Sequence, residues 1–245
     1  MDPRLAAALT PAQPGTFVRV MGSIIPGVGR TRDQIVSYAE EWAAEAEAAV
    51  AGKMPVFVAL GDSLAQGIGA SSRAAGYVSL VSDDLRKRRG QDFAVLNLSR
   101  SGARLHDVLE TQLPALDAAN VRLIGGICTV GSNDLVRSGR LGQTRNRFSE
   151  VLVALPEEIL MATIPDAKSL AAKRMNRYLR AEAQRIDRPL ADVAAALTTW
   201  RGMVAGDGFH PNDRGHRLWA DTVLAALGPQ PQGTEPLVTQ YVPRR

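Results

Sequence analysis

From Pro55 onward the chain repeats a short apolar segment, a loop and a longer amphipathic segment, and this alternation limits its fold more than any other feature. The apolar segments are mostly continuous, as expected for strands that helices cover on both faces. The expected strands are 55–60, 94–98, 121–130, 158–164 and 189–193, and the expected helices are 74–89, 103–112, 144–154, 168–186 and 211–227. Alternation at this spacing predicts an α/β fold with a doubly wound, five-stranded parallel sheet.

The segments on either side of this pattern predict an arm and a tail. Residues 1–52 are expected to form an N-terminal arm with one helix that packs on the main domain, 53–227. The capping-box pattern Thr31-x-x-Gln34 predicts that this helix begins at Thr31, and Gly52 is expected to end it. Phe17–Met21 is a candidate short strand before that helix. Residues 228–245 are rich in proline and lack periodicity, so we expect a loose tail.

The charge pattern argues against a nucleic-acid partner. The net charge is +4, and most of the basic residues are scattered along the chain. The one basic run, 86–89, falls where a helix is expected to end, and cations there interact favourably with the helix dipole. A solvated helix end is therefore the preferred interpretation, and a nucleic-acid or anionic-membrane patch is the alternative.

The cysteine, histidine and hydropathy patterns argue against a disulfide-bonded, a metal-binding and a membrane-spanning protein. A single cysteine, Cys128, excludes an internal disulfide, and the three histidines do not cluster with it, so we expect no metal site. No apolar run approaches the roughly 18 residues of a spanning helix, so no stable membrane insertion is expected. The N-terminal stretch also lacks the features of a signal peptide, which gives a cytoplasmic location as the expectation.

Four polar loops that carry glycine follow strands of the predicted sheet. Their sequences are Gly61-Asp62-Ser63-Leu64, Asn97-Leu98-Ser99-Arg100-Ser101-Gly102, Val130-Gly131-Ser132-Asn133-Asp134 and Gly206-Asp207-Gly208-Phe209-His210-Pro211. The carboxyl ends of parallel strands meet at one edge, where such folds place their sites. We therefore expect these four loops to surround one site.

The residues of these loops are those that nucleophilic catalysis requires. A serine hydroxyl needs an adjacent base, and the base needs a third group to orient it. Asp207 and His210 are three apart, so the carboxylate can reach one imidazole nitrogen while the other faces Ser63. Reaction also creates an oxyanion, for which the backbone N–H groups of Ser63 and Gly102 and the side-chain amide of Asn133 are candidate donors. A glycine at 102 would also leave room for an approaching carbonyl group.

Together, the four loops resemble the sequence blocks of the SGNH hydrolases, also called GDSL esterases and lipases. The resemblance spans Pro55 to about Leu227, and the arrangement with its arm is most similar to members from arginine-rich actinobacterial proteomes. It implies a flavodoxin-like three-layer sandwich and a triad of Ser63, His210 and Asp207. It also implies an oxyanion hole from Ser63, Gly102 and Asn133, no metal or organic cofactor, and a small-molecule or lipid ester as substrate.

Two carboxylates beside these positions have alternative interpretations. Asp62 is expected to support the site by hydrogen bonds between loops, and the alternative is a second catalytic carboxylate. Asp134 is expected to cap a helix, and the alternative is a substrate contact.

Hydrolysis of carboxylic esters through an acyl-enzyme is the leading functional hypothesis. Thioester cleavage or acyl transfer would use the same residues. A flavodoxin-like binding module is the alternative from another class, but the 61–63 turn lacks the Gly-Lys-Ser/Thr ending of a phosphate-binding loop. An inactive scaffold would leave Asp207 and His210 without a role. The sequence does not identify the acyl group, the alcohol or the oligomeric state.

Overall fold

A five-stranded parallel sheet forms the centre of the computed structural model, which describes residues 2–10, 26–137, 141–166, 169–228 and 239–240. The strands are β1 (Val56–Gly61), β2 (Ala94–Asn97), β3 (Arg122–Thr129), β4 (Ile159–Ala162) and β5 (Leu190–Ala191). They lie in the order β2-β1-β3-β4-β5, and each neighbouring pair is parallel. The predicted α/β fold is confirmed, and each strand lies within the range expected from its apolar run or one residue beyond it.

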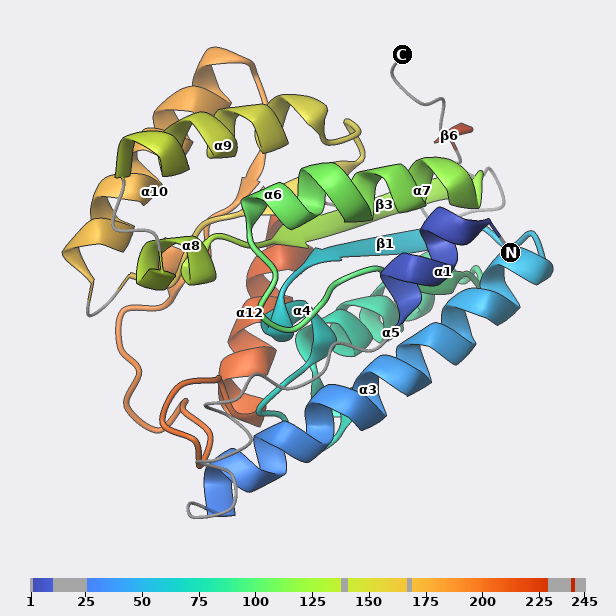
Figure 1. Ribbon diagram of the computed structural model, residues 1–245, viewed down its shortest axis with the longest axis horizontal. Coiled ribbons are helices and arrows are strands. Elements are labelled where there is room, and N and C mark those ends of the chain that lie inside the picture. The colour runs from blue at the N-terminus through green and yellow to red at the C-terminus, as the bar shows by residue number, and fades with distance from the viewer. Residues whose placement is uncertain (1, 11–25, 138–140, 167–168, 229–238, 241–245) are drawn as a thin grey trace.

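Helices cover both faces of the sheet, which produces three layers (Figure 1). One face carries α4 (Ser63–Gln66), α5 (Tyr77–Arg89) and α12 (Asp213–Ala226). The other carries α6 (Leu105–Asp107), a π-helical turn (Val108–Gln112), α7 (Leu113–Ala119), α9 (Leu141–Ala154) and α10 (Leu170–Arg185). Short elements complete the domain: a 3₁₀ turn (Arg73–Ala75), α8 (Ser132–Arg137) and α11 (Val193–Ala196). Alternate β1 side chains enter opposite cores, with Val58 in one and Phe57 in the other.

The N-terminal arm differs from its prediction. It holds two helices among its described residues, α1 (Pro3–Leu9) and α3 (Pro26–Ala51), where one was expected. The predicted start at Thr31 is wrong, because the helix begins five residues earlier with a proline, a residue suited to a first helical turn. The candidate strand Phe17–Met21 lies outside the described residues.

Helix α3 runs along the β2 edge of the sheet and joins both hydrophobic cores (Figure 1). Ala46 and Ala49 on its C-terminal half pack into the α7 side, whereas Ile35 and Trp42 pack into the α5 side. The helix α3 is therefore packed on the sheet and on the helices of both faces.

The tail contains one described strand that the prediction of a loose segment missed. This strand, β6 (Thr239–Gln240), pairs antiparallel with Arg122 and Leu123 at the start of β3. β4 pairs with β3 only from Gly126 onward, which leaves the beginning of β3 open to another strand on that side.

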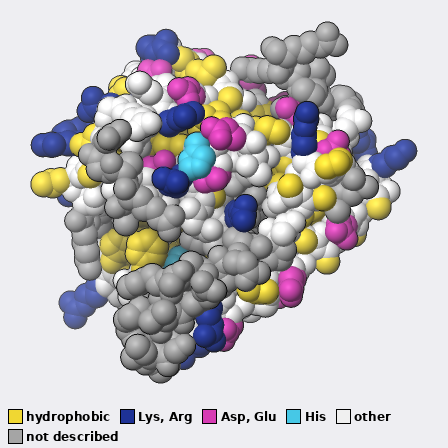
Figure 2. All heavy atoms as spheres, in the orientation of Figure 1, with side chains coloured by type: hydrophobic (Ala, Val, Ile, Leu, Met, Phe, Trp, Pro, Cys, Tyr) yellow, Lys and Arg dark blue, Asp and Glu magenta, His cyan; other side chains and the backbone are white. Residues whose placement is uncertain are grey.

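Charged side chains of both signs are mixed on the surface, and the single cysteine is buried. Lys and Arg are spread among Asp and Glu over the face that Figure 2 draws. The basic run occupies the last turn of α5, where Arg86 contacts Asp83 and donates to the Phe93 carbonyl. Cys128 is buried in β3. Across the described residues, no helix has the length and apolarity needed to cross a membrane.

Candidate active site

Ser63 lies at the sharp turn where β1 ends and α4 begins. The side chain of Asp62 caps α4 by accepting a hydrogen bond from the Leu64 N–H at 3.1 Å. Behind this turn, the Gln112 side chain accepts from the Gly61 N–H at 2.7 Å and donates to the Gly61 carbonyl at 2.8 Å. These bonds hold Ser63 at the carboxyl edge of the sheet. Gln112 was not predicted as a site residue, because it lies in a π-helical turn that the hydrophobic periodicity does not reveal.

His210 lies between Ser63 and Asp207, two other residues of the predicted triad. Its Nε2 is 2.9 Å from the Ser63 Oγ, and its Nδ1 is 2.6 Å from the Asp207 Oδ2. Both side chains are largely shielded, with exposed fractions of 14% for His210 and 5% for Asp207. If Nδ1 carries a proton for the carboxylate, Nε2 is left to accept the serine proton. This is the arrangement that an activated serine requires.

Asp207 is held in its ionised form. Burial alone would raise its pKa, but the hydrogen bond and charge of His210 and the N–H of Phe209 outweigh burial and lower the pKa well below its usual range. A further donor is the hydroxyl of Thr31 from α3, 2.8 Å from Oδ2. Thr31 was predicted to cap the helix, and its contact with Asp207 was not predicted.

The three predicted oxyanion donors come from three loops at this edge. Among the described residues, the N–H groups of Ser63 and Gly102 have no protein acceptor. The Asn133 amide donates to the Ala103 carbonyl at 3.0 Å and, more weakly, to Asp62 Oδ2 at 3.3 Å. Asn133 therefore joins the loops, and both of its amide protons have protein partners.

Gly102 has a backbone conformation that favours glycine, in addition to the room that it would leave for a substrate carbonyl. Its φ is +81°, a left-handed conformation that side chains disfavour. A Cβ at this position would meet no atom within 4 Å, so crowding by the protein is not the constraint.

Asp62 accepts hydrogen bonds from two loops of the site. It is buried, and burial raises its pKa to about 6, against the opposing effects of the Leu64 N–H and the His210 charge. Its two oxygens accept from Leu64 and Asn133, so it links the first loop to the third.

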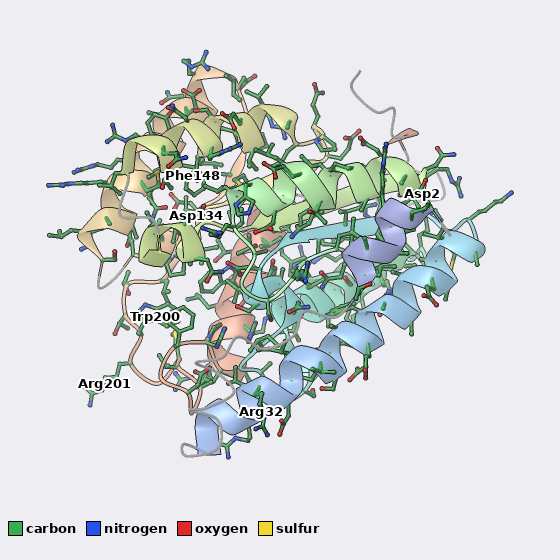
Figure 3. All side chains as sticks on the ribbon, viewed as in Figure 1. Asp2, Arg32, Asp134, Phe148, Trp200 and Arg201 are labelled. Carbon is green, nitrogen blue, oxygen red and sulfur yellow. The ribbon has the colours of Figure 1, made fainter. Side chains whose placement is uncertain are left out.

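Asp134 caps a helix other than its own. It lies in the first turn of α8, but its Oδ2 accepts from the N–H of Leu105, the first residue of α6, at 3.1 Å. Burial raises its pKa, and the same N–H opposes that shift. The contact ties the loop that ends in Asn133 to the loop that contains Gly102. Figure 3 shows Asp134 on α8 near the end of α6.

An apolar cavity of about 280 Å³ opens beside Ser63 and His210. Its apolar lining includes Leu64, Val130, Leu135, Ile164, Pro165, Trp200, Val204, Phe209 and Trp219. Trp200 lies on the loop before α12, and its ring centroid is 6.3 Å from that of Trp219 (Figure 3). Phe209 remains 58% exposed at the rim. The cavity can accept an apolar group whose polar end reaches Ser63.

No metal-binding cluster of His, Cys, Asp and Glu occurs in the part of the chain that the structure describes. His106 lies 3.4 Å from Asp107 and does not line the cavity. His216 is buried in α12, where its Nδ1 accepts from the Tyr77 N–H and its Nε2 faces the Ile68 carbonyl.

The sequence model of the GDSL-like lipase/acylhydrolase family matches residues 59–218, which contain all four loops. The chain belongs to this family. Membership places it among hydrolases, and the matched region leaves α1 and α3 outside. A comparison with curated proteins gave no significant match.

Solved structures of other proteins share the fold. The chain is 24% identical to TesA at a TM-score of 0.60, with 71% of this chain and 98% of that chain covered. Axe2, an acetylxylan esterase from Geobacillus stearothermophilus, has 17% identity, a TM-score of 0.55 and coverages of 71% and 94%. The psychrotrophic esterase EstA from Pseudoalteromonas sp. has 17% identity, a TM-score of 0.56 and coverages of 70% and 96%. At these identities the likeness extends to the fold alone.

Proposed function

We propose that this GDSL family member hydrolyses carboxylic esters through an acyl-enzyme on Ser63. The observation that carries the proposal is the position of His210, which contacts the Ser63 hydroxyl at 2.9 Å and the Asp207 carboxylate at 2.6 Å. A serine, histidine and aspartate linked by hydrogen bonds in this way raise the nucleophilicity of a serine that is otherwise inert near neutral pH.

In the proposed first half-reaction, the Ser63 Oγ attacks the ester carbonyl while His210 Nε2 takes the hydroxyl proton. The ionised Asp207 stabilises the imidazolium that forms. Collapse of the tetrahedral adduct breaks the bond to the alkoxy oxygen, which leaves as an alcohol with the proton from His210. In the second half-reaction, His210 takes a proton from a water molecule as its oxygen attacks the acyl-enzyme carbonyl. Collapse of this second adduct breaks the bond to the Ser63 Oγ, His210 returns the proton to that oxygen, and the carboxylic acid is released.

The oxyanion of the adduct would be held by the three donors near Ser63. The N–H groups of Ser63 and Gly102 have no other acceptor among the described residues, so they can donate at once. Asn133 must exchange one partner, and the weaker contact is the one with Asp62 at 3.3 Å. We propose that the N–H group that donates to Asp62 turns its hydrogen bond to the oxyanion. The other N–H group keeps its bond to the Ala103 carbonyl.

The cavity supports esters with an apolar acyl group as substrates. Its lining is mostly apolar and includes Ser63, so an acyl chain bound there would contact apolar side chains such as Trp200 and Phe209. Two of the structural neighbours, Axe2 and EstA, are described as esterases, which agrees with ester hydrolysis, and one EstA structure is described as inhibited by monoethylphosphonate.

Hydrolysis of p-nitrophenyl esters tests the proposal. We expect the wild type to release p-nitrophenol and Ser63→Ala to lose several orders of magnitude in kcat/KM. Ser37→Ala is a matched control, because it removes an exposed hydroxyl on α3 whose partner among the described residues is the Asp33 carbonyl. A rate in Ser63→Ala equal to the wild type would refute the proposal. A thioester and an added alcohol acceptor in the same assay distinguish ester cleavage from the two related reactions.

A further inference from the structure

We infer that Thr31, on the arm helix α3, is a positioning residue for the Asp207 carboxylate. This inference rests on the proposed function, because it gives Asp207 the role of orienting His210. α3 lies outside the residues that the GDSL family model matches, 59–218, so the family pattern does not assign Thr31 a role.

The contacts of Asp207 separate into local ones and one distant one. Oδ1 accepts from the N–H groups of Phe209 at 2.9 Å and His210 at 3.0 Å, and Oδ2 accepts from His210 Nδ1. These three donors belong to the same short loop and would move with it. Among the described residues, Thr31 is the one donor from another element, at 2.8 Å from Oδ2. It therefore fixes the carboxylate relative to the body of the protein.

The hydroxyl of Thr31 has two acceptors within reach but one proton. The Gly27 carbonyl, one turn earlier in α3, is 3.2 Å away, whereas the Asp207 oxygen is 2.8 Å away and charged. Hydrogen bonds to charged acceptors are the stronger ones, so the carboxylate takes the proton. Because Thr31 is only 6% exposed, water competes weakly for this bond.

The backbones of α3 and the Asp207 loop meet too closely for a side chain at Gly27. A Cβ built there would lie 1.9 Å from the Gly206 carbonyl oxygen. Gly27 and Thr31 are four residues apart and share one face of the helix. The close approach at Gly27 therefore brings the Asp207 loop within reach of the Thr31 hydroxyl.

The same helix also holds the segment that follows Ser63. The Gln34 side chain accepts from the Gly69 N–H at 3.0 Å and donates to the Ala70 carbonyl at 2.7 Å, and Trp42 Nε1 donates to the Gln66 carbonyl at 3.1 Å. α3 thus contacts the loops on both sides of the hydrogen bond between Ser63 and His210. One rigid helix serves as the common support for the serine and the carboxylate.

Loss of the Thr31 donor is expected to affect kcat more than KM. Thr31 does not line the substrate cavity, so ground-state binding should change little. The Asp207 carboxylate would lose one hydrogen bond that fixes its orientation. The His210 ring, which Asp207 orients, would then be aligned less well with the Ser63 hydroxyl. A lost bond to a charged group predicts a fall in kcat of roughly tenfold or more.

The experiment compares Thr31→Val, Thr31→Ser and Thr222→Val. Thr31→Val keeps the shape and removes the donor, and Thr31→Ser restores the donor. Thr222 on α12 is a matched control, because its hydroxyl bonds the carbonyl four residues earlier, at Leu218, and does not line the cavity. We expect low kcat with an almost unchanged KM in Thr31→Val, and near wild-type kcat in the other two. Equal kcat in Thr31→Val and the wild type, or no recovery in Thr31→Ser, would overturn the inference.

Two controls keep this result separate from folding and from the proposed function. Active-site titration with a fluorophosphonate counts the reactive serines, so kcat is expressed per competent site. If Thr31→Val does not fold, Thr31→Ala replaces it. Ser63→Ala is measured in parallel. An active Ser63→Ala overturns the ester-hydrolase proposal itself, whereas an inactive Ser63→Ala with a wild-type Thr31→Val overturns only the role of Thr31.

Discussion

At the scale of single residues, His210 connects the candidate site, because its two ring nitrogens contact groups that lie far apart in the chain. Ser63 follows β1, and Asp207 lies in the loop before α12. These three positions could be predicted from sequence because each combines a reactive side chain with a glycine-bearing loop at the same sheet edge.

Asp207→Asn should lower kcat by about four orders of magnitude. The amide keeps the size of the carboxylate, but it cannot stabilise a protonated imidazole and favours the wrong tautomer of His210. We expect the melting temperature to change far less than kcat. Steady-state kinetics and thermal unfolding of the same sample check this, and a kcat within tenfold of the wild type would argue against the triad.

Asn133→Ala should lower kcat by roughly 10²-fold or more, as the loss of one oxyanion donor does in other hydrolases. It also removes the bond to the Ala103 carbonyl, so some loss of stability is expected. Thermal unfolding of the same sample measures this loss, and Asn133→Asp is a second variant that keeps the size of the side chain but removes both donor contacts. If Asn133→Asp hydrolyses esters as fast as the wild type, Asn133 is not an oxyanion donor.

Other residues of the site could not be predicted because their roles depend on tertiary contacts. Thr31 begins a capping-box pattern, yet it lies inside a helix that starts at Pro26 and bonds Asp207. Gln112 has no local motif, and its bonds to Gly61 depend on how the second crossover packs. Asp134 was expected to be a cap, but the helix that it caps begins 29 residues earlier in the chain.

At the scale of elements, the strands were easier to predict than the helix starts. A buried parallel strand is bounded by the limits of its apolar run, so β1 and β3 lie within about a residue of their predicted ranges. The start of α3 was missed because Pro26 and the two glycines after it resemble a loop. Packing against β2 and the Asp207 loop compensates for these weak helix formers.

Gly27→Ala tests the close backbone contact between α3 and the Asp207 loop. The added methyl group would overlap the Gly206 carbonyl, so either the helix or the loop must shift. Because the loop carries Asp207, we expect kcat to fall with a smaller change in KM. Gly142→Ala is the control, since a Cβ at that position in α9 meets nothing within 4 Å. Wild-type kcat in Gly27→Ala would show that the loop tolerates displacement.

His216 should make stability depend on pH. Burial lowers its pKa from 6.5 to about 4, a shift that the bond to Ile68 opposes. Between these values the unfolded chain binds a proton that the folded protein does not, so stability is highest above pH 6.5 and falls as the pH drops toward 4. The full effect is about 3 kcal/mol.

Denaturant unfolding of the wild type and His216→Gln across this range measures the effect. We expect a smaller loss of stability on acidification in the variant, even if it is less stable at neutral pH. Asp62 acts in the opposite direction, because its pKa is raised to about 6 and its contribution weakens as the pH rises from 3.8. The difference between the two proteins isolates His216, and parallel pH curves would contradict the assignment.

At the scale of the whole molecule, the fold places an apolar cavity next to the reactive groups. The loops after β1, β3 and β4 and the segment before α12 contribute to its walls. The sequence predicted the layers and the sheet, because both follow from the alternation of apolar runs and helices. It did not predict the cavity, because Trp200 and Trp219 are brought together by the packing of α12 on the sheet.

The cavity predicts that kcat/KM rises with the length of the acyl chain until the cavity is filled. Each buried methylene contributes about 0.8 kcal/mol, which is up to about fourfold in kcat/KM. Trp200→Ala should flatten this profile, whereas Val153→Ala, a change at an exposed apolar position on α9, should not. A series of p-nitrophenyl esters gives the slope, and activity restricted to acetate in the wild type would contradict an acyl role for the cavity.

The role of Ser63 as the nucleophile can be tested directly by treatment with a fluorophosphonate, which reacts with activated serines. The labelled residue is then identified by peptide mapping with mass spectrometry. We predict a single adduct on the peptide that contains Ser63, no adduct in Ser63→Ala, and much slower labelling in His210→Ala. Labelling of another serine, or labelling of Ser63 that does not depend on His210, would contradict the claim that Ser63 is the nucleophile.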